Sequence, residues 1–134
     1  MTDLLYQTDS YLKEFTATVT TVDEAARSIV LDRSAFYPGG GGQPCDYGQI
    51  SADGVNYPVT SVKKAGADVL HFLGCEAPLP KIGATVSGVL DWQRRHNLMR
   101  THSALHVLCG VVFRDYGAQV TGGNMDPLEG RMDF

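Results

Sequence analysis

Cysteine is scarce in this sequence of 134 residues, and the few cysteines present exclude a disulfide framework. Cys45, Cys75 and Cys109 are odd in number, widely spaced and form no Cys-x-x-Cys motif, which is typical of a protein from a reducing compartment. No apolar run approaches the roughly 20 residues that span a bilayer, and the N-terminus lacks a basic segment followed by an apolar one. We therefore expect a cytoplasmic protein with no membrane partner.

Positive charge is also in short supply. The sequence has 11 Lys and Arg against 15 Asp and Glu, a net charge of −4, so the whole molecule does not attract nucleic acid and any RNA contact must be local. The densest basic cluster is Arg94, Arg95 and Arg100. It is either such a local contact or a solvated helix face.

Residues 15–90 have the pattern of short strands separated by turns. Residues 14–20 alternate, with Phe15, Ala17 and Val19 on one face, and together with residues 28–31 they predict a hairpin. Further strands are expected at residues 47–51, 57–62, 68–73 and 84–90. Six short strands at near-regular spacing predict a small antiparallel β-barrel over residues 1–90, which includes a glycine-rich loop.

The hydrophobic period changes at Asp91, a suitable N-cap, and predicts a helix of about 22 residues that ends near Gly117. Residues 120–124 predict a turn, and residues 130–134 begin a strand. We place a second domain at residues 91–134. Because one helix and one strand do not bury each other's apolar faces, this domain looks unfinished, and its exposed apolar residues predict self-association.

Two histidines lie four residues apart within this predicted helix. His102 and His106 therefore occupy one face, one turn apart, where both imidazoles can reach one metal ion. That arrangement is half of a zinc site, whereas the alternative is a pair of half-buried histidines with ordinary hydrogen-bond partners. Cys109 lies about 10 Å of helical rise beyond His102, too far to share a zinc ion with it. His71, in a predicted strand, is most simply a sheet histidine.

Four consecutive glycines, residues 39–42, precede Gln43 and form the other unusual feature. Because the glycines lack Cβ atoms, their backbone amides can approach a ligand closely or adopt positive φ angles. A flexible hairpin loop is the alternative. The sequence contains no phosphate loop of the GxxxxGK[ST] type, and no helix follows the glycines as a dinucleotide-binding motif requires.

The two features belong to longer motifs that occur in a fixed order. The first is Phe36-Tyr37 followed by Gly41-Gly42-Gln43, Asp46 and Gly48, and the second is Asp91-Trp92-Gln93-Arg94-Arg95 followed by His102-Ser103-Ala104-Leu105-His106. Together they resemble the editing region of alanyl-tRNA synthetase and its free-standing AlaX relatives, from about residue 15 to residue 134. The resemblance implies a β-barrel similar to that of translation factors, followed by the start of an α+β editing domain, with one long helix plus a strand, that hydrolyses mischarged tRNA.

The resemblance also implies a site. Zinc would be held by His102, His106 and a later Cys-x-x-x-His pair, so this chain supplies two of the four ligands, and we expect it to be the N-terminal part of a longer protein. The ion would activate water or orient the substrate, which is serine or glycine wrongly attached to tRNA(Ala) and bound through its acceptor end. The implied substrate-binding residues are Gly40, Gly41, Gly42, Gln43, Asp46 and Ser103, and the implied tRNA-binding residues are Arg94, Arg95 and Arg100. The alternative is a non-catalytic module that binds tRNA or a synthetase.

Overall fold

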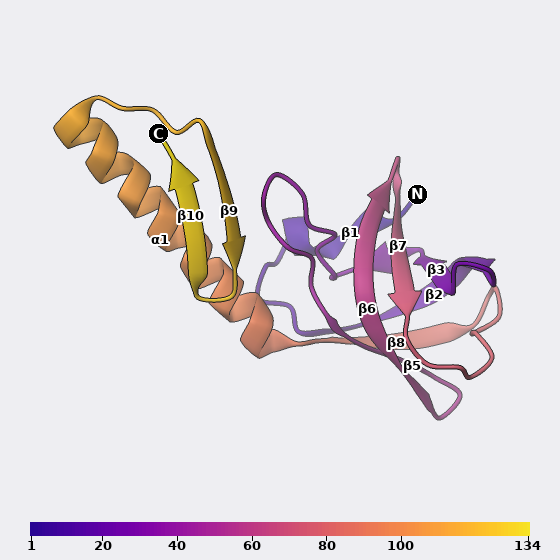
Figure 1. Ribbon diagram of the computed structural model, residues 1–134. Coiled ribbons are helices and arrows are strands. Elements are labelled where there is room, and N and C mark those ends of the chain that lie inside the picture. Colours follow the sequence, from indigo (N-terminus) through magenta and orange to yellow (C-terminus); the bar gives the residue numbers. More distant parts are fainter. The chain divides into compact units, whose positions relative to one another are not determined.

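The computed structural model describes all 134 residues and divides them into two compact units. The first unit comprises Met1–Gly39 and Cys45–Asp91, and the second comprises Gly40–Pro44 and Trp92–Phe134. The tip of the glycine loop thus belongs with the C-terminal unit, whereas the sequence-based division assigned the whole loop to the barrel. Figure 1 labels α1 and most of the strands of the two units.

The first unit is a closed antiparallel barrel of six strands, as the sequence predicts. In spatial order the strands are β2 (Glu14–Asp23), β3 (Ser28–Leu31), β7 (Asp68–Leu73), β6 (Val55–Ala65), β5 (Gly48–Ala52) and β8 (Thr85–Leu90), and β8 pairs again with β2. Closure leaves the barrel without a free strand edge. A short parallel pair, β1 (Asp3–Leu4) with β4 (Arg33–Ser34), and a 3-10 helix, η1 (Leu5–Gln7), accompany the barrel.

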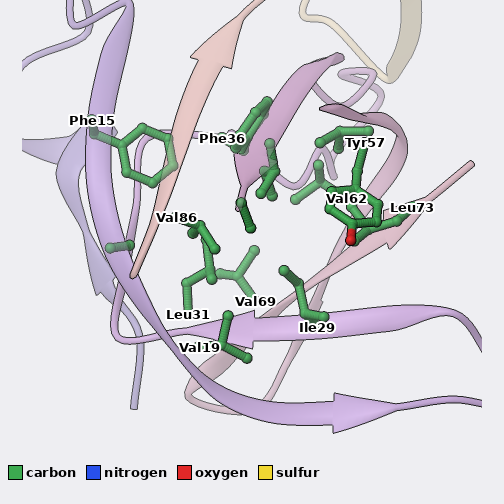
Figure 2. Close-up of a cluster of buried hydrophobic side chains, with 14 of the residues drawn as sticks. Phe15, Val19, Ile29, Leu31, Phe36, Tyr57, Val62, Val69, Leu73 and Val86 are labelled. Carbon is green, nitrogen blue, oxygen red and sulfur yellow. The ribbon is translucent and has the colours of Figure 1, made fainter. Parts of the chain in front are cut away.

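The barrel is filled by side chains that alternate along its strands. On β2 the side chains of Phe15, Ala17 and Val19 are buried. Those of Glu14, Thr16 and Thr20 are exposed, as expected because successive side chains of a strand point to opposite faces. The predicted hairpin of β2 and β3 is also confirmed. Figure 2 shows side chains from several strands converging on this core, with the ring of Phe15 near that of Phe36.

His71 lies inside this core on β7 and is completely buried. The carbonyl oxygen of Ile29 can only accept a hydrogen bond, so Nδ1 of His71, 3.2 Å away, carries the proton and donates it. Nε2 then accepts from the Ser34 hydroxyl at 2.7 Å, and the Ser34 oxygen accepts from the backbone N–H of Phe36 at 3.1 Å. The histidine is therefore a fully satisfied, neutral core residue, and burial lowers its pKa to about 4.

The second unit consists of one long helix and a β-hairpin. Helix α1 (Trp92–Tyr116) ends where predicted, because Gly117 adopts a φ of +68° and its N–H bonds to the carbonyl of Phe113 at 2.8 Å. None of the helices combines the length and apolar character that crossing a membrane requires.

The predicted turn at residues 120–124 is wrong. Most of that segment belongs to strand β9 (Gly122–Asp126), which pairs antiparallel with β10 (Glu129–Asp133), so the helix carries two strands and not one. The turn lies instead between the two strands, where Leu128 has a φ of +62°. Glycine and asparagine disfavour strands as isolated residues, but here the cross-strand pairing and the packing on α1 outweigh that local preference.

Candidate functional site

The hairpin is fastened to α1 at three levels along the helix. The Thr101 hydroxyl donates to the carbonyl of Asn97 at 2.9 Å and accepts from the N–H of Leu128 at 2.9 Å, which fixes the hairpin turn. One turn further along, the Leu105 side chain lies so close to Gly130 that a Cβ there would be 3.1 Å from it. Cys109 then contacts the Met132 sulfur at 3.2 Å. These contacts hold β9 and β10 over one face of the helix.

His102 and His106 also meet on α1. Their rings are nearly parallel, with centroids 4.8 Å apart and an interplanar angle of 16°, and their Nε2 atoms are 2.8 Å apart. His102 is partly exposed and His106 is exposed. The two nitrogen atoms that a metal ion would use thus lie side by side.

The glycine loop is a tight turn and not a flexible connector. All four glycines have positive φ angles, and Gly40 and Gln43 exchange two backbone hydrogen bonds of 2.9 and 3.0 Å. The carbonyl of Gly42 accepts the N–H of Met125 at 3.2 Å, and a Cβ on Gly42 would lie 2.7 Å from the carbonyl oxygen of Gly123. Only glycine therefore fits at position 42, against the backbone of β9.

The glycine loop and the histidine pair line one cavity within the second unit. Its volume is about 380 Å³, in the range of small-molecule sites. The wall is formed by Gly41, Gly42, Gln43, His102, Leu105, His106, Val120, Thr121, Gly122, Gly123, Asn124, Met125 and Met132. Two motifs separated by about 60 residues in the sequence thus face the same space.

Three of the predicted substrate-binding residues do not line this cavity. Gly40 lies outside the wall, and Ser103 is exposed on α1 next to His102. Asp46 is 1% exposed, and its carboxylate accepts the N–H of Tyr37 at 2.8 Å while its own N–H donates to the Tyr37 carbonyl at 2.9 Å. These two hydrogen bonds close the base of the glycine loop.

The three arginines of the basic cluster differ in exposure. Arg100 is exposed, Arg94 is partly exposed, and Arg95 is only 6% exposed. They therefore do not form one open basic face.

The hairpin residues of the wall were missed by sequence reasoning. Thr121, Asn124 and Met132 belong to a segment predicted as a turn and an isolated strand, and no local pattern places such residues beside a helix face. The tertiary contacts at Thr101 and Leu105 are what bring them there.

Within the whole chain, the histidine pair has no third partner for a metal ion. No group of three or more His, Cys, Asp or Glu side chains is arranged to hold one, and Cys109 is engaged with Met132. The pair itself is compatible with zinc, because two nitrogens bound at 2.0–2.1 Å to a tetrahedral ion are about 3.3 Å apart, roughly half an ångström more than observed. The chain thus brings two imidazole nitrogens together within 2.8 Å.

The sequence of the barrel matches a known family of proteins. The sequence model of the family described as class II (A) tRNA synthetases matches residues 6–94, about two thirds of the chain. That match covers the barrel and the first residues of α1.

Individual relatives are more specific than the family model. The alanyl-tRNA editing protein AlaX-M of Methanosarcina mazei is 43% identical over 140 residues, which cover 100% of this chain and 55% of the relative. AlaX-M of Saccharolobus solfataricus is 38% identical over 136 residues, 100% of this chain and 56% of that protein. The alanine–tRNA ligase of Thermococcus kodakarensis is 47% identical over 120 residues, 89% of this chain and 13% of the ligase.

The chain belongs to the AlaX family. Its sequence is also similar to one region of the alanine–tRNA ligases. It spans about half the length of the curated AlaX-M relatives it matches.

Proposed function

We propose that this chain carries part of the active site of a trans-editing hydrolase that deacylates mischarged tRNA(Ala), with serine or glycine as the wrongly attached amino acid. The observation that carries the proposal is the shared cavity, since the glycine loop and the histidine pair line it together. The names of the relatives, alanyl-tRNA editing proteins and alanine–tRNA ligases, support it. In this proposal the barrel is of the translation-factor type and the second unit is the beginning of an α+β editing domain.

His102 and His106 would hold a zinc ion through their Nε2 atoms, as two of four ligands. Such an ion supplies Lewis-acid chemistry at an ester carbonyl or lowers the pKa of water. The exposed ring of His106 leaves the pair open to ligands from outside the chain. Because Nε2 binds the metal in its neutral form, zinc affinity should fall as pH is lowered.

The glycine loop would bind the ester end of the substrate. The amides of Gly41 and Gly42 donate no hydrogen bond within the chain, so they are available for the oxygen on which negative charge develops during ester hydrolysis. Gln43 and Thr121 offer further polar groups from the same wall. Gly40 and Asp46 would act indirectly, because their backbone and carboxylate contacts hold the loop in shape.

Two further contacts complete the proposal outside the cavity. Ser103, exposed next to His102 on α1, would form a hydrogen bond with the hydroxyl of a seryl substrate. Arg94 and Arg100 would contact phosphates of the acceptor end. The burial of Arg95 makes it the weakest of the three candidates.

Zinc content and deacylation test the proposal together. When the two remaining ligands are supplied by further sequence or by a second polypeptide, we expect about one zinc per site by elemental analysis. We then also expect hydrolysis of Ser-tRNA(Ala) or Gly-tRNA(Ala) in preference to Ala-tRNA(Ala), and both properties should be lost in the His102→Ala/His106→Ala variant. His96→Ala is the matched control, because His96 is exposed on the same helix, stacks on Trp92 and does not line the cavity. Equal zinc content in the wild type and the double variant would contradict the metal assignment.

The alternative is a non-catalytic module that binds tRNA or a synthetase. The chain has no third group placed to hold a metal ion beside the histidine pair. If the purified protein contains no zinc, the binding module is favoured over the hydrolase. Binding of tRNA(Ala) without deacylation, with an affinity that decreases with salt, would support this alternative and refute the hydrolase.

A further inference from the structure

Two sulfur atoms meet where β10 packs on α1. The thiol of Cys109 donates to the sulfur of Met132 at 3.2 Å. Figure 1 shows β10 alongside the helix, and the two elements are in contact. Both side chains are partly buried, and Cys109 forms no disulfide. The pair therefore lies at an internal packing contact of the second unit, and the function proposed for the cavity does not use it.

His106 is a neighbour of both sulfur-containing side chains. It precedes Cys109 on α1 by three residues, and residues at this spacing lie on one face with Cβ atoms about 5–6 Å apart. His106 and Met132 also line the same cavity. Any two of the three side chains are thus neighbours along the helix, in the cavity wall or through the sulfur contact. One imidazole and two sulfur atoms occupy one small region of the second unit.

The chemistry of these three groups selects one kind of metal ion. Zinc is held in proteins by Cys, His, Asp and Glu side chains, and no three such side chains are arranged to hold an ion in this chain. Thiolate and thioether sulfurs are soft ligands that select monovalent copper, and imidazole also suits copper. The thioether of Met132 therefore favours Cu(I) over zinc at this position.

We propose that His106, Cys109 and Met132 form a binding site for Cu(I). The three ligands are one imidazole nitrogen, the Cys109 thiolate and the Met132 thioether. The thiol releases its proton to solvent when the ion binds, and the flexible side chain of Met132 lets its sulfur adjust to the ion. The proposal concerns only the second unit and does not rest on the function proposed for the cavity.

The copper site and the histidine pair exclude each other. Nε2 of His106 is 2.8 Å from Nε2 of His102, whereas Cys109 lies about 10 Å of helical rise beyond His102. The ring of His106 must therefore turn away from His102 to join the two sulfur atoms in binding one ion. Occupation of the copper site thus removes one of the two nitrogens that a zinc ion would use.

Titration of the chain with Cu(I) tests the proposal. The purified chain, stripped of metal by a chelator and kept reduced without oxygen, competes for Cu(I) with a coloured Cu(I) chelator. We expect one Cu(I) per chain. Cys109→Ser, His106→Gln and Met132→Leu should each weaken the affinity by at least about tenfold. Met132→Leu nearly conserves the packed volume, so its effect reports the loss of the sulfur ligand.

Two matched controls separate this site from generic binding of copper to sulfur. Cys75 is also a partly buried free cysteine but belongs to the barrel unit, and Met99 lies on α1 about 15 Å of helical rise before Cys109. Cys75→Ser and Met99→Leu should leave the affinity for Cu(I) unchanged. An equal loss of affinity in Cys75→Ser and Cys109→Ser would overturn the proposal.

X-ray absorption at the copper edge identifies the ligands directly, even if a variant folds poorly. The wild type should show two sulfur ligands and one nitrogen ligand, and Met132→Leu should show one sulfur ligand. A single sulfur ligand in the wild type would reduce the sulfur contact to ordinary packing and refute the site. Half a copper ion per chain would mean that Cu(I) bridges two molecules, which refutes it as well.

Discussion

Acid should destabilise the barrel through one buried residue, His71. Burial lowers the pKa of this histidine to about 4, whereas an unfolded chain has a histidine pKa near 6.5. Between these values the unfolded chain binds a proton that the native barrel excludes, so stability is complete above about pH 6.5 and decreases as the pH falls toward 4. The difference of about 2.5 pKa units corresponds to about 3 kcal/mol of unfolding free energy.

The assay is urea unfolding followed by circular dichroism at several pH values between 7.5 and 4. We expect the wild type to lose the stated stability, and His71→Gln to lose much less of it, because glutamine can still form hydrogen bonds but does not titrate. His96→Gln is the control, since His96 is exposed and its replacement should leave the pH dependence unchanged. An equal pH slope in His71→Gln and the wild type, or a His71 ring that titrates near pH 6.5 by NMR, would refute the reasoning.

Two further predictions concern the second unit. Gly42→Ala should destabilise the glycine loop by about 1–3 kcal/mol more than Gly41→Ala. Both residues have positive φ angles, but only a Cβ at position 42 would meet the carbonyl oxygen of Gly123. Faster hydrogen exchange across the second unit in Gly42→Ala alone would confirm this, and equal exchange in the two variants would contradict it. Thr101→Val should lower the unfolding free energy by about 1–3 kcal/mol, because it leaves the N–H of Leu128 without its acceptor. Thr101→Ser should retain most of that stability, and thermal unfolding of the two variants compares them; identical midpoints would show that this hydrogen bond is unimportant.

The barrel was predictable because its signal is local. Phe15, Ala17 and Val19 reveal the buried face of β2 by simple alternation, and the glycine at position 117 marks the end of α1 by its known preference for left-handed conformations. Each of these inferences needs only neighbouring residues, and the structure confirms the strands and the helix.

The hairpin could not be predicted in the same way. Gly122, Gly123 and Asn124 have the composition of a turn, and they form a strand only because β10, the Gly42 carbonyl and α1 all contact the segment from elsewhere in the chain. The wall of the cavity depends on such distant partners. The same holds for Asp46, whose motif predicts a substrate contact, whereas its carboxylate is directed at the backbone of Tyr37.

Because the tip of the glycine loop belongs to the second unit, that unit cannot be separated from the barrel by a single cut in the chain. Residues 40–44 leave the barrel segment and contact β9 through Gly42, and the chain returns to the barrel at Cys45. A graft of residues 92–134 onto another scaffold would carry both histidines but neither Gly42 nor the acceptor for the Met125 amide. The cavity is therefore not a transferable module, since one of its walls is encoded about 50 residues before the helix begins.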